Sequence, residues 1–374
     1  MKKHYDVAAY IWPAYTGDEK RSKMFWPEGY GEWQTVKNAK KNASEKPLDY
    51  KWDRQPLWGY VNEADPYVME MEIQAAHDHG VNVFIYDWYW YDDRPFLENC
   101  LNDGYLKARN NDLVKFYIMW ANHHANHMWN VDLSSEMGSE VIWSGAADFE
   151  KFKKLVDRWI NKYFKHPSYY KIDGKPVFMI YTVKHFVEGI GGWENARRAL
   201  DYFREETVKA GFPGLHIQAT ALMKSLFVND GKLVPAEVGN LYDLLGFDST
   251  THYQMRDQYY MNWDYEEVIR VQAEQYQWMD DQKRLTYFPH VTLGWDTNPR
   301  YRHYRDDVTT GATPDKIERA MRQAKEYIDT HDLPAPLVVV NSWNEWTETS
   351  YLEPDNLYGY GYLEAVKRVF VDQE

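Results

Sequence analysis

Residues 81–90 read VNVFIYDWYW, an apolar run rich in β-branched and aromatic residues. A run of this length and composition is typical of a buried strand. Helical patterns lie on both sides of it, at 65–79 and at 94–108. Gly80 stands where the first of these helices should end, and Asp65-Pro66 has the form of an N-cap followed by proline at the first helical position. The stretch therefore predicts a helix–strand–helix unit.

The same alternation continues along the chain. Seven more apolar runs share the character of the first, and they lie at 5–12, 114–122, 176–183, 215–221, 243–249, 288–295 and 336–343. Further helical patterns lie between or after them, at 146–164, 193–210, 264–281, 314–331 and 359–370, with a weaker one at about 222–240. Eight strands alternating with about eight helices predict right-handed crossovers and a parallel sheet.

The fold class predicted by this pattern is α/β, as a closed (β/α)8 TIM barrel. A doubly wound open sheet is the alternative, and it is disfavoured because no glycine-rich phosphate turn follows an early strand. No repeat, low-complexity tract or linker divides the chain, so residues 1–374 are predicted to form a single barrel catalytic domain. A long, aromatic-rich loop, 13–64, follows the first strand. Such loops are usually functional, and a small satellite core that packs the loop down is the alternative.

Composition excludes several classes of protein. The chain is 44% hydrophobic and 17% aromatic, so it can fill a large core. Its formal net charge is −14 and no Lys/Arg cluster offers a basic surface, so we expect no nucleic-acid partner. Cys100 is the single cysteine, which excludes an intramolecular disulfide and a cysteine-rich zinc site. No stretch reaches 18 consecutive apolar residues, so no membrane span is expected.

The N-terminus gives an expectation about localisation. Lys2 and Lys3 are not followed by an apolar stretch, so the sequence as written predicts no secretory signal. The written sequence fits the cytoplasm, whereas a signal trimmed from the chain would place the protein in the periplasm or outside the cell. The compartment is therefore left open.

Aromatic residues stand beside carboxylates, amides and imidazoles at most of the predicted strand ends, where barrels carry their chemistry. Such pairs suit a sugar, whose C–H faces stack on aromatic rings and whose hydroxyls need polar partners. A phosphate would instead call for Arg, Lys or a glycine nest. For any single ring, packing in the core is the alternative. The predicted substrate-binding residues, for an oligosaccharide or polysaccharide, are Trp12, Asp87, Trp88, Trp90, Trp120, Asn122, His123, Tyr181, His252, Tyr253, Trp295, Asp296, Asn344, Trp346 and Glu353.

Glu345 and Glu348 are the predicted catalytic residues, because glycosidic cleavage needs an acid for the leaving oxygen and a second carboxylate for attack at C1. In a turn after strand eight they would share a face, and burial beside indole would raise a carboxyl pKa as a general acid requires. The alternative for each is a solvated or capping carboxylate.

The histidines of the HHANH run, 123–127, offer a rival interpretation as a metal site. His123 and His127 have the i, i+4 spacing of a zinc-binding helix. The apolar strand before them argues for a loop, however, and the glutamate of an HExxH motif is missing. We therefore expect no metal and no other cofactor.

The run NEWTETSYLEP at 344–354 resembles the N-E-W-x-E-x-x-x-x-E-P signature of glycoside hydrolase family 99, and more closely its WbsX-like relatives, often labelled glycosyltransferase-like or lipopolysaccharide-biosynthesis proteins. Further matches lie at 31–33, 65–66, 84–90, 120–122 and 358–364. The resemblance implies a (β/α)8 barrel with metal-independent, retaining, endo-acting α-mannosidase or mannanase chemistry, in which the substrate's own 2-hydroxyl is the nucleophile.

The resemblance also implies roles for the two glutamates. Glu345 would assist the 2-hydroxyl, and Glu348 would be the acid/base at the leaving oxygen. Thr347 and Thr349 stand where the family usually has His and Gly, so sugar identity and linkage are not transferred. The expected function is a retaining glycoside hydrolase acting on an α-linked glycan. A polysaccharide-biosynthesis glycosyltransferase and a non-catalytic glycan-binding barrel are the alternatives.

Overall fold

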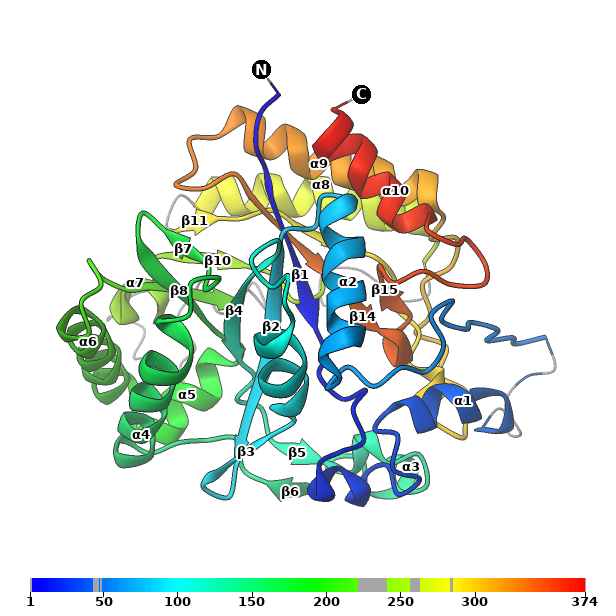
Figure 1. Cartoon of the computed structure of the whole chain (residues 1–374), viewed down its shortest axis with the longest axis horizontal. Coiled ribbons are helices and arrows are strands. Elements are labelled where there is room, and N and C mark those ends of the chain that lie inside the picture. The colour runs from blue at the N-terminus through cyan, green and yellow to red at the C-terminus, as the bar shows by residue number, and fades with distance from the viewer. Residues whose placement is uncertain are drawn as a thin grey trace.

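The computed structural model describes residues 2–42, 47, 49–220, 241–255, 263–282 and 285–373. A parallel sheet runs through the middle of the molecule, with helices packed around it and the two chain termini close together at one end (Figure 1). The strands of this sheet are β1 (Asp6–Ile11), β2 (Val83–Tyr91), β4 (Lys115–Trp120), β8 (Lys175–Ile180), β9 (His216–Thr220), β10 (Ser249–Thr251), β11 (Thr286–Tyr287), β12 (His290–Thr292) and β13 (Leu337–Asn341).

The sheet is curled, and its strand order is β11-β10-β9-β8-β4-β2-β1-β13-β12 with every neighbouring pair parallel. Only Phe288 and Pro289 separate the two end strands along the chain. The Phe288 amide donates to Thr250 on one side, and the Pro289 carbonyl accepts from Val339 on the other. Proline has no N–H to give to a ladder, which explains why this strand is split into two short pieces. The predicted α/β class with a parallel sheet is confirmed.

Most helices that follow these strands agree with the sequence pattern. They are α2 (Pro66–Asp78), α4 (Phe149–Trp159), α6 (Trp193–Lys209), α8 (Tyr265–Gln282), α9 (Pro314–Thr330) and α10 (Gly361–Lys367). The Asp65 carboxylate caps α2 by accepting from the Tyr67 amide, and Pro66 occupies the first turn, as the sequence predicts. None of the described helices is long and apolar enough to cross a bilayer.

Short helices and short strands complete the described fold. The short helices are α1 (Trp33–Asn42), α3 (Ser134–Met137), α5 (Val183–Ile190) and α7 (Leu241–Leu245). The short strands are β3 (Arg94–Phe96), which pairs with β2, β7 (Lys171–Ile172), which pairs with β8, and the two hairpins β5 (Ala125–Asn126) with β6 (Val141–Trp143) and β14 (Asn344–Glu345) with β15 (Ser350–Tyr351).

Three local predictions are wrong. The run 243–249 begins as helix α7 and reaches a strand only at Ser249, because its apolar spacing fits one helical turn as well as a strand. The pattern at 94–108 starts as strand β3 and continues as short π and 3₁₀ turns. The 13–64 segment is not all loop, since it contains α1. The weak helix at about 222–240 lies outside the described residues.

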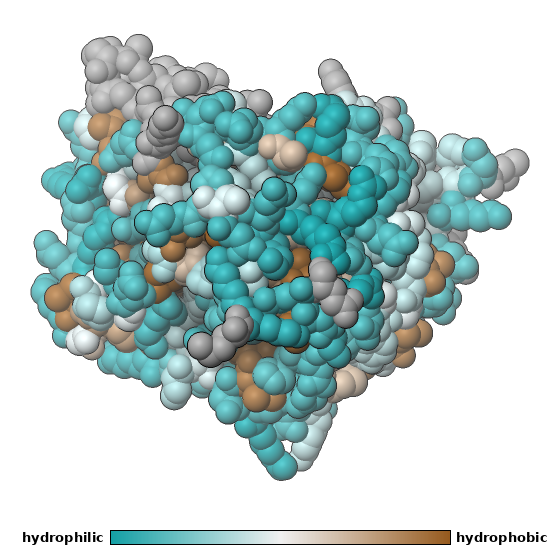
Figure 2. Space-filling model, turned by 90° about the horizontal axis from the view of Figure 1, so that it is seen from above, coloured by the Kyte–Doolittle hydropathy of each residue, from teal (hydrophilic) through white to brown (hydrophobic). Residues whose placement is uncertain are grey.

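Much of the aromatic content is buried rather than displayed. The fully buried tryptophans include Trp26 and Trp33 from the 13–64 segment. Trp26 packs near Trp12 and Trp129, with ring centroids 6.4 and 6.3 Å away. On the face shown in Figure 2, hydrophobic residues are scattered among hydrophilic ones. The satellite-core interpretation therefore holds for these rings of the long segment.

Candidate active site

A cavity of about 360 Å³ lies at the C-terminal ends of the strands. It contains seven of the predicted site residues, five from the ends of five different strands and two from the segment that follows β13. These residues are Trp12, Asp87, His123, Tyr181, Tyr253, Glu345 and Glu348. The strand ends thus bring together both predicted catalytic carboxylates and three aromatic rings predicted to bind substrate.

The β14–β15 hairpin positions the two carboxylates. The Glu345 amide donates to the Ser342 hydroxyl at 2.8 Å, and that hydroxyl donates to the Ser350 carbonyl across the hairpin at 2.5 Å. Glu348 ends the short 3₁₀ helix Trp346–Glu348 that forms the hairpin's turn. Because the chain turns between them, both side chains face the cavity instead of alternating as on a straight strand.

Thr349 closes this turn in a left-handed conformation, with φ of 58°. That region favours glycine, and a β-branched side chain is strained there. Two contacts hold the side chain: the Trp52 indole donates to its hydroxyl at 2.9 Å, and the hydroxyl donates to the Asp296 carbonyl at 3.1 Å. The side chain of Thr349 is therefore fixed by neighbouring loops.

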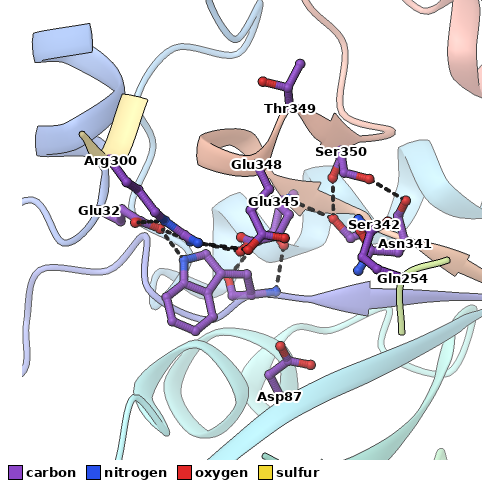
Figure 3. Close-up of polar contacts among 12 residues, drawn as sticks. Glu32, Asp87, Gln254, Arg300, Asn341, Ser342, Glu345, Glu348, Thr349 and Ser350 are labelled. Carbon is purple, nitrogen blue, oxygen red and sulfur yellow. Dashed lines mark hydrogen bonds and ion pairs between the residues drawn. The ribbon is translucent and has the colours of Figure 1, made fainter. Parts of the chain in front are cut away.

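Arg300 joins the two carboxylates and a third one (Figure 3). Its guanidinium donates to Glu345 Oε1, Glu348 Oε1 and Glu32 Oε1, each at 2.9 Å. The side chain of Arg300 is only 3% exposed. A planar guanidinium offers several donors in fixed directions, so one arginine can hold all three carboxylates.

Burial dominates the electrostatics of the cavity. It raises the pKa of Glu345 well above the usual range, although Arg300 works against this effect. Burial would lower the pKa of Arg300, but Glu32, Glu345 and Glu348 together raise it far above normal. Glu345 Oε2 has no hydrogen-bond partner among the described residues. One oxygen of Glu345 is therefore held by the arginine, while the other is left to meet a ligand.

Asp87 is a further carboxylate of this cavity, and Figure 3 shows it apart from the arginine contacts. Burial raises its pKa well above the usual range; the hydrogen bond from Tyr253 lowers it and the charge of Glu348 raises it further. The Tyr253 hydroxyl donates to Asp87 Oδ2 at 3.1 Å, and Oδ1 has no partner in the described part of the chain. Asp87 can therefore accept from, or when protonated donate to, a ligand hydroxyl.

The sequence did not predict a role for Arg300 or Glu32. Arg300 comes from the loop after β12, among other charged residues, and nothing in its spacing sets it apart. Glu32 lies in the predicted 31–33 match, but only the fold reveals that it accepts from the Trp12 indole at 2.5 Å and from Arg300. Both contacts join residues that are not neighbours in the sequence, so no short sequence pattern predicts them.

Three of the predicted tryptophans lie outside this cavity. Trp88 and Trp90 alternate with Asp87 along β2, so they point to the opposite face of the sheet. There Trp88 donates to Glu98 at 2.7 Å and stacks with Trp90, with centroids 5.8 Å apart. Trp120 packs against Trp159 of α4. These rings belong to the interface between the sheet and its helices.

Four other predicted residues also have structural partners away from the cavity lining. Asn122 is held by the main chain of Thr182 through two hydrogen bonds. His252 bonds the Tyr287 hydroxyl at 2.9 Å, and burial lowers its pKa to about 3. Trp295 lies 3.5 Å from Asp307 through its indole nitrogen. Asp296 accepts from Tyr50 and borders a second cavity, of about 660 Å³.

Asn344 and Trp346 lie on the hairpin and Glu353 follows it, and none of the three lines the cavity. Trp346 donates to Glu353 at 2.5 Å, and Asn344 donates to Glu63.

The histidines of the 123–127 run do not form a metal-binding helix, because His127 starts a short 3₁₀ helix. His123 lines the cavity, and burial lowers its pKa to about 4. Among the described residues, the side chains with metal-ligand spacing are Glu63, Glu72 and Glu353.

A family model described as glycosyltransferase WbsX matches residues 7–366. Two curated relatives, both described as uncharacterized protein WxcX from strains of Xanthomonas campestris pv. campestris, are 21% identical over 360 residues, or 92% of this chain. The match covers 46% of each relative, so the chain spans about half the length of the curated relatives it matches.

Solved structures share the fold across nearly the whole chain. A glycoside hydrolase family 99 endo-α-mannosidase from Bacteroides thetaiotaomicron superposes with a TM-score of 0.58 at 13% identity, covering 98% of this chain and 96% of that one. A second structure of that enzyme, with bis-tris propane, reaches 0.62 at 13% identity and covers 100% and 98%. A glycoside hydrolase-like protein reaches 0.58 at 15% identity and covers 99% and 94%. At these identities the likeness concerns the fold.

Proposed function

Because the chain belongs to the glycosyltransferase WbsX family, we propose that it is a glycan-active enzyme, a retaining glycoside hydrolase that cleaves an α-linked glycan. An endo-acting α-mannosidase or mannanase is the nearest model for its activity. In this proposal β11 and β12 count as one interrupted strand of an eight-stranded barrel, and the cavity at the strand ends is the active site.

One observation carries the proposal. Glu345 and Glu348 project from a single hairpin into a cavity that aromatic side chains also line, and one buried arginine holds both carboxylates. Trp12, Tyr181 and Tyr253 offer faces for a pyranose ring, and Asp87 offers a partner for a hydroxyl. Two carboxylates beside a sugar-sized, aromatic-lined cavity are the groups that glycosidic cleavage requires.

The proposed reaction assigns one proton transfer to each glutamate. Glu345 accepts the proton of the sugar's 2-hydroxyl as that oxygen bonds to C1. Glu348 gives a proton to the leaving oxygen as the bond from C1 to that oxygen breaks. The product of this step is a 1,2-anhydro sugar and a free alcohol. Water then opens the anhydro ring at C1, with both proton transfers reversed, so the configuration at C1 is retained overall.

Arg300 shapes this chemistry without touching the reacting atoms. It binds the Oε1 atom of each glutamate, which leaves Glu345 Oε2 to face the substrate's 2-hydroxyl. The opposing effects of burial and of Arg300 tune the basicity of Glu345, since burial raises its pKa and the guanidinium lowers it. A base tuned in this way accepts a proton more readily than a fully solvated carboxylate does.

A glycosyltransferase is the second candidate, and the family's description favours it. A nucleotide-sugar donor carries a diphosphate, which needs a metal or several basic groups. In the described lining of the cavity, Arg300 is the basic residue of fixed charge, and three carboxylates already hold it. This charge balance favours hydrolysis of a neutral glycan. A non-catalytic glycan-binding barrel is the third candidate, and both glutamates would be dispensable to it.

Leaving-group dependence tests the proposal. Glu348→Gln should lose most activity on α-linked oligosaccharides, whose leaving alcohols need a proton, and keep more on an activated aryl glycoside. Glu345→Gln should slow both substrates alike, because the 2-hydroxyl must be assisted whatever leaves. Each loss should be roughly 10²–10⁴-fold. A 2-deoxy-2-fluoro substrate should be nearly inert and leave no lasting adduct.

Three results would count against this account. Labelling of either glutamate by the fluoro sugar would make that carboxylate a direct nucleophile. Transfer from a nucleotide sugar, without hydrolysis, would favour the second candidate. Binding of glycans without turnover by the wild type would favour the third.

A further inference from the structure

A second group of carboxylates lies outside the cavity, between helix α2 and the β14–β15 hairpin. Glu63 precedes α2, Glu72 lies within it and Glu353 follows β15. Their exposures are 0%, 0% and 2%, and one oxygen from each lies within 4.8 Å of the others. Figure 1 places α2 beside this hairpin, in agreement with these contacts.

Neutral donors, not basic side chains, orient the three carboxylates. Asn344 Nδ2 donates to both oxygens of Glu63, at 2.9 and 3.1 Å. The Trp343 indole donates to Glu72 Oε2 at 3.2 Å, and the Trp346 indole donates to Glu353 Oε2 at 2.5 Å. Burial raises the pKa of Glu63 and of Glu353, and neighbouring carboxylates raise both further: Glu72 and Glu353 act on Glu63, and Glu72 acts on Glu353.

Two oxygens of this group have no hydrogen-bond donor. Within the described residues, Glu72 Oε1 and Glu353 Oε1 are buried and unpartnered. A buried carboxylate oxygen without a donor is unfavourable, and native proteins pair such atoms with water, a proton or an ion. Both atoms belong to carboxylates that meet at one point, so a ligand between them would satisfy them together.

We propose that Glu63, Glu72 and Glu353 bind a hard divalent cation, Ca²⁺ in preference to smaller ions, beneath the hairpin that carries Glu345. Two oxygens that each lie about 2.3–2.6 Å from one Ca²⁺ can be no more than roughly 5 Å apart, and the three carboxylates satisfy this limit. Bound in monodentate or bidentate fashion, they supply about three to six oxygen ligands.

The chemistry of the donors excludes a soft-metal site. The group contains no imidazole. Cys100 Sγ donates to Glu63 Oε2 at 3.5 Å, but the thiol is not part of the group of converging ligand atoms. Carboxylate oxygens alone select calcium, magnesium or manganese.

A cation bound here would hold in place the segment of the hairpin that carries Glu345. Asn344 and Trp346 flank Glu345 in sequence and both donate to the carboxylate group. Asn344 also holds the main chain of Trp12, accepting from its amide at 2.7 Å and donating to its carbonyl at 2.9 Å. The site is distinct from the proposed glycan cavity, and it stands or falls independently of the proposed function.

Metal content and thermal stability test the proposal on the full chain. Protein purified without chelator should carry near-stoichiometric metal by elemental mass spectrometry. After chelation, Ca²⁺ alone should raise the midpoint of thermal unfolding, by on the order of 5 °C at 100-fold over its Kd. Mg²⁺ and Mn²⁺ should act more weakly. Alkylation of Cys100, the single cysteine, should slow as Ca²⁺ is added, because its thiol contacts Glu63.

Two matched variants test whether the Ca²⁺ that raises the melting midpoint binds at these carboxylates. Glu72→Gln should abolish the response to Ca²⁺, and in chelator it should melt no lower than the wild type because it removes one buried charge. Glu70→Gln, on the same helix but partly exposed, should keep the full response.

The proposal is overturned if the purified wild type carries no metal and its midpoint does not respond to Ca²⁺, Mg²⁺ or Mn²⁺. The carboxylates would then hold protons instead. A response that survives Glu72→Gln would overturn this location for the ion. If that variant does not fold, Glu353→Gln and the metal content of the wild type decide the question.

Discussion

The β14–β15 hairpin separates two groups of carboxylates whose hydrogen-bond partners differ. On the cavity side, Glu32, Glu345 and Glu348 share the guanidinium of Arg300. On the side facing α2, the donors that the second group meets among the described residues are indoles, an amide and one thiol. The same short segment of chain supplies glutamates to both groups.

The difference shows how one hairpin can serve chemistry and support at once. A carboxylate held by an arginine at one oxygen keeps the other oxygen available, as Glu345 does. A carboxylate oriented by an indole, as Glu353 is, has fixed geometry but no basic partner among the described residues. The first arrangement suits proton transfer to a substrate, and the second suits an ion that stays in place.

The largest effect should follow from removing the arginine. Arg300→Met leaves three carboxylates, those of Glu32 and Glu345 buried, without their counterion, so the free energy of unfolding should fall by about 3–5 kcal/mol. Denaturant titration measures this loss. Arg302→Met is the control, because its ion pair with Asp132 is exposed and should contribute at most about 1 kcal/mol. Equal losses in the two variants would show that the cavity carboxylates do not depend on Arg300.

Two variants should show that the two groups of carboxylates have separate roles, because each variant should change one property and leave the other intact. Glu348→Gln should change the dependence of rate on the leaving group, through a loss of roughly 10²–10⁴-fold on glycans, and leave the response of the melting midpoint to Ca²⁺ intact. Glu353→Gln should remove that response and leave the leaving-group dependence as in the wild type. Parallel kinetics and melting curves check both. If each variant changed both properties, the hairpin would act as one unit rather than two.

Asp87 should give a smaller, pH-dependent effect on stability. Burial raises its pKa in the folded protein, so the folded state binds the proton more tightly than the unfolded state does. Its contribution is fully present below the ordinary aspartate pKa and is lost as pH rises through the raised one. Asp87→Asn should therefore be more stable than the wild type at neutral pH, by roughly 1–3 kcal/mol, and the gain should vanish in acid.

Melting curves from acid to neutral pH check this expectation. Asp103→Asn, at an exposed ion pair, provides the control and should show no such trend. A wild type that stays as stable as Asp87→Asn at every pH would mean that Asp87 is solvated or paired in solution.

The smallest effect should come from rings on the outer face of the sheet. Trp90→Phe should change KM for a glycan by less than about twofold, since Trp90 packs beside Trp88 outside the cavity. Trp12→Phe should raise KM by roughly fivefold, about 1 kcal/mol, because its ring lines the cavity. Steady-state kinetics on one oligosaccharide compares the two. A larger rise in KM for Trp90→Phe than for Trp12→Phe would indicate that the substrate binds on the outer face of β2.

Local patterns predicted the fold class and seven of the residues that line the cavity. The alternating runs are sufficient for a parallel α/β sheet, and the short 344–354 motif carries both glutamates because the hairpin itself is local. The aromatic pattern at the end of β2 does not distinguish the two faces of the strand, so Trp88 and Trp90 were predicted to bind substrate together with Asp87. Strand alternation could have separated them, had the inward face been known.

The rest of the site depends on tertiary structure. Arg300 and Glu32 lie 268 positions apart in sequence, and no window of residues relates them. The role of Glu353 also changes when α2 is seen beside the hairpin, because Glu72 approaches it from the other side. The sequence marks Glu353 as a carboxylate near the motif, but only the fold shows that it turns away from the cavity.

The central claim is that a sugar sits in the cavity with its C1 facing Glu345 and Glu348. A crystal structure of Glu348→Gln with a bound α-linked oligosaccharide tests it most directly. We expect a pyranose against Trp12 and Tyr253, with its 2-hydroxyl within hydrogen-bond distance of Glu345 and its glycosidic oxygen beside residue 348. A sugar bound instead in the cavity beside Tyr50 and Asp296, with the pocket around Arg300 occupied only by water, would contradict it.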